Sequence, residues 1–146
     1  MIREDKDLLL KDLCARLPYG VIINTPKGDG HLCSINQTIF RNEYGVNIEA
    51  TKRDYFNDDK LNFKPYLRPM SSITTEEEYE YHQIRKRNSY KSLTLMDCSD
   101  HLEQLLFPII VGTESIDWLN AHHFDYRGLI EKGLALKAPE GMYNIN

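Results

Sequence analysis

The chain has 146 residues, which is the size of one domain and enough to bury a hydrophobic core without disulfides or metals. Its composition, 41% hydrophobic and 27% charged, is typical of a globular protein in water. The net charge of −4 argues against a general attraction to nucleic acid or anionic membrane, and no stretch approaches the roughly 20 apolar residues of a membrane span. Three cysteines without an export signal predict reduced thiols, and hence a cytoplasmic protein without a membrane segment.

The first half of the chain predicts a helix followed by a small antiparallel sheet. Leucines and Cys14 recur at three- and four-residue spacing over 4–17, which gives one buried apolar stripe, and "PYG" ends the helix. Two strand-like runs flank "PKGDG" at 26–30 and predict a β-hairpin, with a third strand at 46–50. The loop lacks the GK[ST] ending of a phosphate-binding loop, so we expect only a turn.

The second half predicts an extended segment and then three to four helices. "FKPYLRPMSS" at 63–72 has two prolines within five residues and should be extended. A helix is expected from 74 to 87, because Thr74 with Glu77 forms a capping-box pattern, as does Thr75 with Glu78. A short strand at 92–96 and a helix from Ser99 follow.

Two further helices are expected near the C-terminus. One spans 116–123 and is capped by Thr113 or Ser115. The other spans 125–133, with Asp125 as N-cap to the N–H groups of 127 or 128, Gly128 permitting close packing against Trp118, and Gly133 as its left-handed end.

The sequence therefore predicts a single α+β domain over 1–138 with a flexible C-terminal tail over 139–146. The expected core consists of Leu9, Leu13, Leu17, Val21, Ile23, Leu105, Leu106, Ile109, Trp118, Leu119, Leu129, Ile130 and Leu134.

The stretch "DWLNAHHFDYRGLIEKG" at 117–133 gathers residue types that are common in active sites. If the protein is an enzyme, His122 or His123 would act as a general base oriented by Asp125, as in a hydrolase. On a helix the two histidines point about 100° apart, so they are poor joint ligands for a metal. We favour a structural interpretation, in which His122 stacks on Trp118 and His123 is partly buried.

Two other chemistries have weaker patterns. His31 and Cys33 with Cys98 and His101 offer four ligands suited to zinc, but the two pairs are more than sixty residues apart and neither is a Cys-x-x-Cys knuckle. The basic segment 84–91 offers a nucleic-acid surface made of Arg85, Lys86, Arg87, Tyr90 and Lys91. Its helix begins with acids, so the basic end also suits the helix dipole.

Three segments carry a resemblance. "LCARLPYGVII" (13–23), "FKPYLRPMSSITTEEEYEYH" (63–82) and "IDWLNAHHFDYRGLIEKGLALKAPEGMY" (116–143) resemble an uncharacterised family of small proteins of phages and prophages of gut bacteria. The resemblance covers about two fifths of the chain and implies a bacterial, mobile-element setting. It implies no activity and no site residue.

The leading hypothesis is a non-enzymatic accessory protein that binds a partner protein and carries no cofactor. Nine tyrosines and an extended, arginine-bearing "KPYLRPM" strip suit a recognition surface. A nucleic-acid-binding protein is the alternative, and a histidine-dependent or zinc hydrolase is the third hypothesis.

Overall fold

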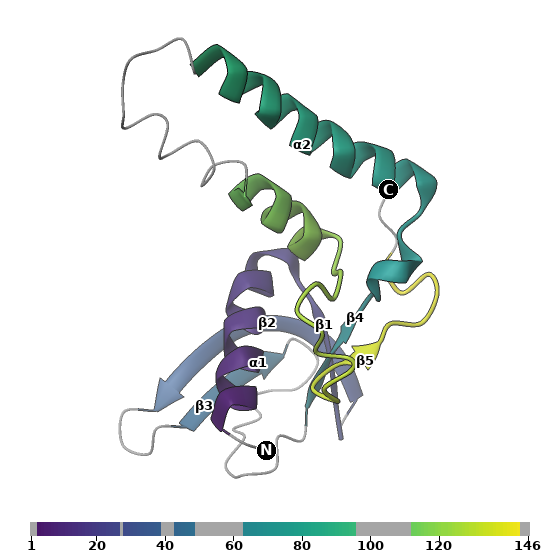
Figure 1. Ribbon diagram of the computed structural model, residues 1–146. Helices are drawn as coiled ribbons and strands as arrows, with labels where there is room; N and C mark the ends of the chain where they lie inside the picture. Colours follow the sequence, from purple (N-terminus) through teal and green to yellow (C-terminus); the bar gives the residue numbers. More distant parts are fainter. Residues whose placement is uncertain (1–2, 27, 39–42, 49–62, 96–111, 144–146) are drawn as a thin grey trace.

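The computed structural model describes residues 3–26, 28–38, 43–48, 63–95 and 112–143. Figure 1 shows their arrangement. The elements are α1 (Arg3–Arg16), β1 (Ile22–Thr25), β2 (Gly28–Thr38), β3 (Glu43–Ile48), β4 (Lys64–Leu67), α2 (Thr75–Leu95), a helix over 112–121, and β5 (Leu136–Lys137). Short 3-10 turns lie at Leu17–Tyr19 and Met70–Ser72. The predicted α+β class is confirmed.

The sheet has the strand order β3-β2-β1-β4-β5. β1 and β2 form the expected hairpin, in which Thr25 pairs with Gly28 and the Thr25 hydroxyl donates to the Gly28 carbonyl at 2.7 Å. β4 adds to β1 in antiparallel orientation, and β5 then pairs in parallel with β4. The sheet is therefore mixed rather than purely antiparallel, because the C-terminal segment returns to the sheet after the helices.

α1 covers one face of the sheet, and the main core lies between them (Figure 1). Of the predicted core residues, Leu9, Leu13, Val21, Ile23, Trp118, Leu119, Leu129 and Leu134 are buried, and Leu17 and Ile130 pack at the margin. Leu105, Leu106 and Ile109 lie outside the described residues. Phe63, Leu67 and Phe124 are also buried, although they were not among the predicted core residues.

A second apolar cluster joins α2 to the rest of the molecule. Trp118, Leu119 and Phe124 form its centre, and Tyr81 and Ile84 of α2 pack against it. Among the described residues, none of the helices combines the length and the apolar composition needed to cross a bilayer.

The strand expected at 92–96 is wrong over its described part, because α2 continues to Leu95. An established helix gains one backbone hydrogen bond for each residue added, so an ambiguous stretch next to it readily joins it. The helix expected from Ser99 lies outside the described residues.

The capping predictions near the C-terminus also need correction. The helix is already formed at residue 112, so Thr113 and Ser115 lie inside it and do not cap a helix at 116. It ends at 121, and His123 takes a left-handed φ of +58° instead of continuing along the helix face.

Residues 125–133 form turns and not the predicted helix. Gly128 has a φ of +72°, which a helix interior does not permit, and nothing lies within 4 Å of the position its Cβ would take. Gly128 is therefore needed for its backbone conformation, and not for close packing against Trp118 as expected.

The left-handed end predicted at Gly133 is confirmed. Gly133 has a φ of +69°, the Leu134 N–H donates to the Leu129 carbonyl at 2.9 Å, and the Gly133 N–H donates to the Ile130 carbonyl at 3.0 Å. This is the Schellman pattern of hydrogen bonds, formed here after a single turn.

Candidate functional site: a groove beside the second helix

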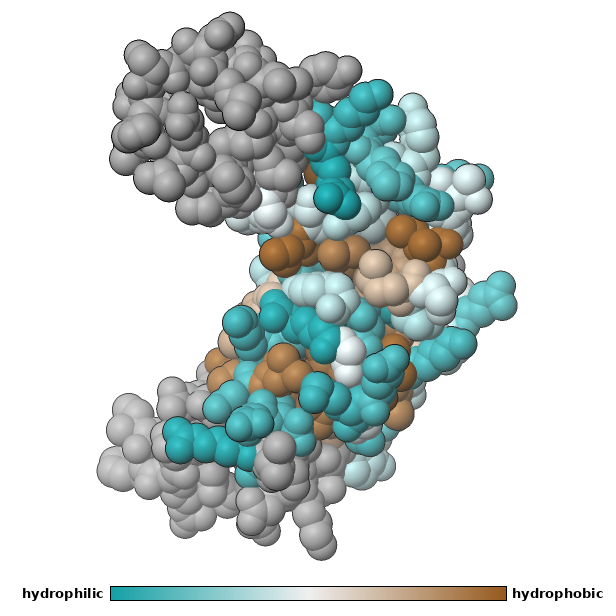
Figure 2. Space-filling view, viewed as in Figure 1, coloured by the Kyte–Doolittle hydropathy of each residue, from teal (hydrophilic) through white to brown (hydrophobic). Residues whose placement is uncertain are grey.

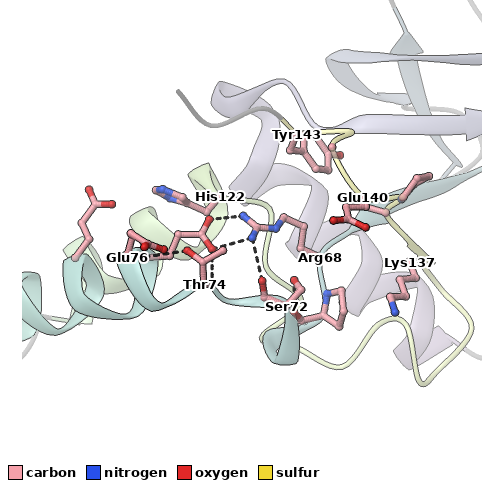
Figure 3. A pocket seen from close by; sticks show the side chains of 14 residues that line it. Arg68, Ser72, Thr74, Glu76, His122, Lys137, Glu140 and Tyr143 are labelled. Carbon is pink, nitrogen blue, oxygen red and sulfur yellow. Dashed lines mark hydrogen bonds and ion pairs between the residues drawn. The ribbon is translucent and has the colours of Figure 1, made fainter.

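An open groove of about 1010 Å³ lies between the first turns of α2 and the segment that follows β5 (Figure 3). Glu76, Glu77 and Glu80 line it from α2, and Lys137, Glu140 and Tyr143 line it from the C-terminal segment. Arg68 and His122 lie between these two walls.

Arg68 follows β4 directly and joins three parts of the fold. Its backbone N–H donates to the His123 carbonyl at 2.8 Å, and its own carbonyl accepts the Asp125 N–H at 2.7 Å. Its guanidinium lies 4.3 Å from the centre of the Phe124 ring. The backbone of Arg68 and the position of its guanidinium are therefore fixed by contacts outside the groove.

The Arg68 side chain is tied to α2 by a two-pronged ion pair with Glu77. Its two terminal nitrogens donate to the two carboxylate oxygens at 2.6 and 2.8 Å, and only 14% of the Glu77 side chain is exposed. The Arg68 hydrogen bonds, opposed by partial burial and aided by the Thr74 N–H, hold the pKa of Glu77 below its usual value.

Glu77 is also the acidic partner of the predicted capping box, which is confirmed for Thr74. The Thr74 N–H donates to the Glu77 carboxylate at 2.9 Å, and the Glu77 N–H donates to the Thr74 hydroxyl at 3.2 Å. The Glu77 carboxylate thus completes the N-terminal cap of α2 and also binds the Arg68 guanidinium.

His122 stacks on Trp118, as the sequence predicts, with ring centres 3.9 Å apart. Its Nδ1 lies 2.9 Å from the Trp118 carbonyl oxygen, and a carbonyl can only accept, so Nδ1 carries the proton. With the Nδ1 proton engaged in this way, Nε2 is the other ring nitrogen of a side chain that lines the groove.

His123 lies behind the groove wall and is buried, with 6% of its surface exposed. Its ring stacks on Tyr143 at 3.8 Å between centres. Burial, together with the nearby Arg16 and other cationic side chains, lowers the pKa of His123 to about 3, so the ring is neutral.

Tyr143 belongs to the segment that was expected to be a flexible tail, yet its side chain is held by two strands. Its hydroxyl accepts the Ile22 N–H at 3.0 Å and donates to the Tyr66 carbonyl at 2.8 Å. These bonds fix the C-terminal wall of the groove to β1 and β4.

Asp125 does not orient either histidine. Its two carboxylate oxygens accept the backbone N–H groups of Leu129 and Ile130, both at 2.9 Å, and not those of 127 or 128 as expected. The carboxylate organises the turn that replaces the predicted helix. The catalytic alternative therefore loses its acid–histidine pair.

The other candidate residues are distributed over the molecule. His31 and Cys33 are exposed on β2, where the His31 Nδ1 lies 2.7 Å from the Gly20 carbonyl. Cys98 and His101 lie outside the described residues, and within the described part no group of three or more histidine, cysteine, aspartate or glutamate side chains could hold a metal. Cys14 is exposed and does not lie on a buried stripe.

The basic residues of α2 face solvent. The side chains of Arg85, Lys86 and Arg87 are exposed, and Arg87 forms a 3.5 Å ion pair with Glu114. Tyr90 and Lys91 also lie on α2. The basic segment is therefore accessible over 85–87.

The chain matches no family model, no curated protein and no solved structure. The groove itself was not predicted from the sequence. Glu77 could be singled out through the capping box, whereas nothing local links Arg68 to it, since the link depends on how β4 meets α2.

Proposed function

We propose that this chain is a non-enzymatic accessory protein that binds another protein, and that the groove beside α2 holds an extended, basic segment of that partner. The observation that carries the proposal is the surplus of carboxylates around the groove. Glu76, Glu80 and Glu140 form no ion pair within the described part of the chain, and Arg68 is already neutralised by Glu77. Lys137 leaves two negative charges uncompensated.

The size and stiffness of the groove support a peptide-like occupant. Its volume lies at the upper limit of pockets that enclose small molecules, which is about 1000 Å³. Its walls are fixed by the Arg68–Glu77 pair and by the Tyr143 hydroxyl, so little ordering is required when a partner binds. Pro69, Ala138 and Pro139 add apolar surface for the stems of lysine or arginine side chains.

The state of the histidines favours binding over catalysis. His122 Nδ1 is engaged by a backbone carbonyl, and the Asp125 carboxylate is engaged by backbone N–H groups. His122 Nε2 has no hydrogen-bond partner among the described residues, and in the neutral tautomer with Nδ1 protonated it can accept a partner's N–H or ammonium group.

Site-specific photo-cross-linking in cells that express the chain tests the proposal. A photoreactive residue replaces Ser72, which lines the groove, or Lys11, which is exposed on α1. We expect one protein adduct from position 72 and none from position 11. Glu76→Lys or Glu80→Lys should reduce the adduct at least tenfold, and peptide mapping should place it on a lysine- or arginine-bearing segment.

Glu131→Lys is the matched control, since Glu131 is exposed, lies outside the groove and undergoes the same charge change. It should leave the adduct unchanged. Equal adducts from positions 72 and 11, or an adduct that survives both groove reversals, would contradict the proposal.

A further inference from the structure

β5 is the last strand of the sheet, and no described strand pairs with its outer edge. In the parallel register Lys137 lies opposite Leu67, and the Ala138 N–H donates to the Leu67 carbonyl at 2.8 Å. The hydrogen-bonding groups of successive strand residues point to opposite sides of the strand. Leu136 and Ala138 therefore bond to β4, whereas the N–H and carbonyl of Lys137 point to the outer edge.

The two backbone groups of Lys137 have no hydrogen-bond partner within the part of the chain that the structure describes. The Arg68 N–H, the nearest donor on β4 in this register, donates to the His123 carbonyl at 2.8 Å instead. Lys137 is also exposed. The edge therefore offers one donor and one acceptor to an added strand.

This edge is continuous with the groove beside α2. Lys137, Ala138 and Pro139 line the groove at the end of β5, and Figure 3 shows Lys137 and Glu140 on the same wall. A chain that pairs with Lys137 can continue into the groove, where the α2 carboxylates form the opposite wall. The surplus of carboxylates there favours a basic chain over an acidic one.

We propose that the partner's basic segment binds as an added β-strand, which pairs its main chain with Lys137 and directs lysine or arginine side chains to Glu76, Glu80 and Glu140. This mode of binding rests on the proposed function and specifies how the groove recognises its occupant. Strand addition takes affinity from main-chain hydrogen bonds and specificity from side-chain contacts. One residue of an antiparallel segment can satisfy both Lys137 groups, since opposed residues exchange two N–H···O bonds.

The open edge is short, which limits what can add to it. The Ala135 N–H already donates to the Leu129 carbonyl at 3.2 Å, and Pro139 has no N–H. Lys137 is therefore the one residue of this edge that offers both groups, among those the structure describes. Long pairing of two copies edge to edge is disfavoured, and a partner needs the groove carboxylates to bind.

Amide hydrogen exchange of the full chain, followed by NMR, tests the edge. After correction for intrinsic rates, the Lys137 N–H should exchange at least tenfold faster than the N–H groups of Leu136 and Ala138. The probe is an eight-residue peptide of alternating lysine and threonine with blocked ends. At saturation it should slow exchange at Lys137 at least tenfold, and a glutamate–threonine peptide should not.

Substitutions at Lys137 separate its main chain from its side chain. Lys137→Pro removes the outward N–H but no bond to β4, so it should weaken binding of the lysine–threonine peptide at least tenfold in calorimetry. Lys137→Ala keeps the N–H and removes a like charge, so it should bind the peptide at least as tightly as the wild type. Circular dichroism checks that both variants fold. The peptide with N-methylated amides, added to the wild type, should also bind at least tenfold more weakly.

The outcomes distinguish this mode of binding from the proposed function. Equal binding by Lys137→Pro and Lys137→Ala, with a Lys137 amide that stays unprotected at saturation, would overturn strand addition. The proposed function would still stand if Glu76→Lys weakened binding and the control Glu131→Lys did not. A peptide that does not bind at all would also overturn strand addition, and cross-linking from position 72 tests the proposed function separately.

Discussion

His123 combines burial with a left-handed backbone. Its φ of +58° is uncommon for a residue with a side chain, and the surrounding bonds determine it from both sides. Its N–H donates to the Asn120 carbonyl at 3.1 Å, and its carbonyl accepts the Arg68 N–H at 2.8 Å. The ring is thereby directed against Tyr143, away from water and close to Arg16. A neutral imidazole is the only form that this environment favours.

This environment predicts a pH dependence of stability. The pKa of His123 falls from 6.5 to about 3 on folding, so the unfolded chain takes up a proton first as the pH falls. The neutral His123 ring therefore contributes fully to the free energy of unfolding above pH 6.5, and this contribution is lost as the pH falls from 6.5 toward 3. At pH 5 the loss should be about 2 kcal/mol of unfolding free energy. The lowered pKa of Glu77 acts mainly below pH 4.5, so Glu77 adds little to the difference in stability between pH 7 and pH 5.

Urea denaturation at pH 7 and pH 5 measures the effect. His123→Asn tolerates positive φ and cannot titrate, so it should lower stability at both pH values but remove most of the difference between them. His82→Gln removes a histidine that is 63% exposed and should keep the full difference. Equal differences in the wild type and His123→Asn would refute the assignment.

The segment 125–133 shows at the scale of one element what a local pattern can predict. Gly133 was correctly predicted as a left-handed end, because that signal depends on neighbours within a few residues. Asp125 does accept backbone N–H groups, but those of Leu129 and Ile130, and it caps no helix. The helix between them was wrong, since Gly128 reverses the sign of φ in the middle. Residue type alone does not distinguish a glycine that packs closely from one that bends the chain.

Glycine substitutions test this difference. Gly128→Ala and Gly133→Ala should each lower the unfolding free energy by about 1–2 kcal/mol, because alanine is strained at φ values of +72° and +69°. Gly112→Ala is the matched control: Gly112 lies in a helix, has no positive φ and also has nothing within 4 Å of its Cβ position. It should raise stability by about 0.5–1 kcal/mol. Thermal or urea unfolding of the three variants measures these changes. If all three substitutions changed the free energy of unfolding in the same direction, positive φ would not explain the effect at Gly128 and Gly133.

Across the whole molecule, the sequence predicted contacts within an element better than contacts between distant elements. α1, the β1–β2 hairpin and the Thr74–Glu77 capping box follow from spacing and were confirmed. The buried face of α1 was only half predicted, because Asp12 and Arg16 are fully buried beside Leu9 and Leu13. Asp12 and Arg16 pair with each other at a helical spacing of four residues, but their other partners, Phe124 and Arg127, lie more than a hundred residues away. Helical spacing therefore could not predict that this pair is buried.

Asp12 and Arg16 join the first helix to the last part of the chain. Arg16 donates to the Asp12 carboxylate at 2.7 and 3.2 Å and to the Phe124 carbonyl at 2.7 Å. Arg127 approaches the same carboxylate to 3.2 Å, and its guanidinium lies 4.9 Å from the Tyr126 ring centre. The buried Asp12 carboxylate therefore contacts two arginines and ties residues 124–127 to α1.

Removing that carboxylate should destabilise the entire fold. Asp12→Asn leaves the fully buried Arg16 without its counter-ion, and loss of one member of a buried pair costs about 3–5 kcal/mol. Asp7→Asn, on the exposed side of the same helix, should change the unfolding free energy by less than about 0.5 kcal/mol. The double variant Asp12→Asn with Arg16→Met should be more stable than the sum of the single effects predicts, because no unpaired charge remains at position 16. Additive effects in this cycle would show that Asp12 and Arg16 act independently, contrary to the geometry of their hydrogen bonds.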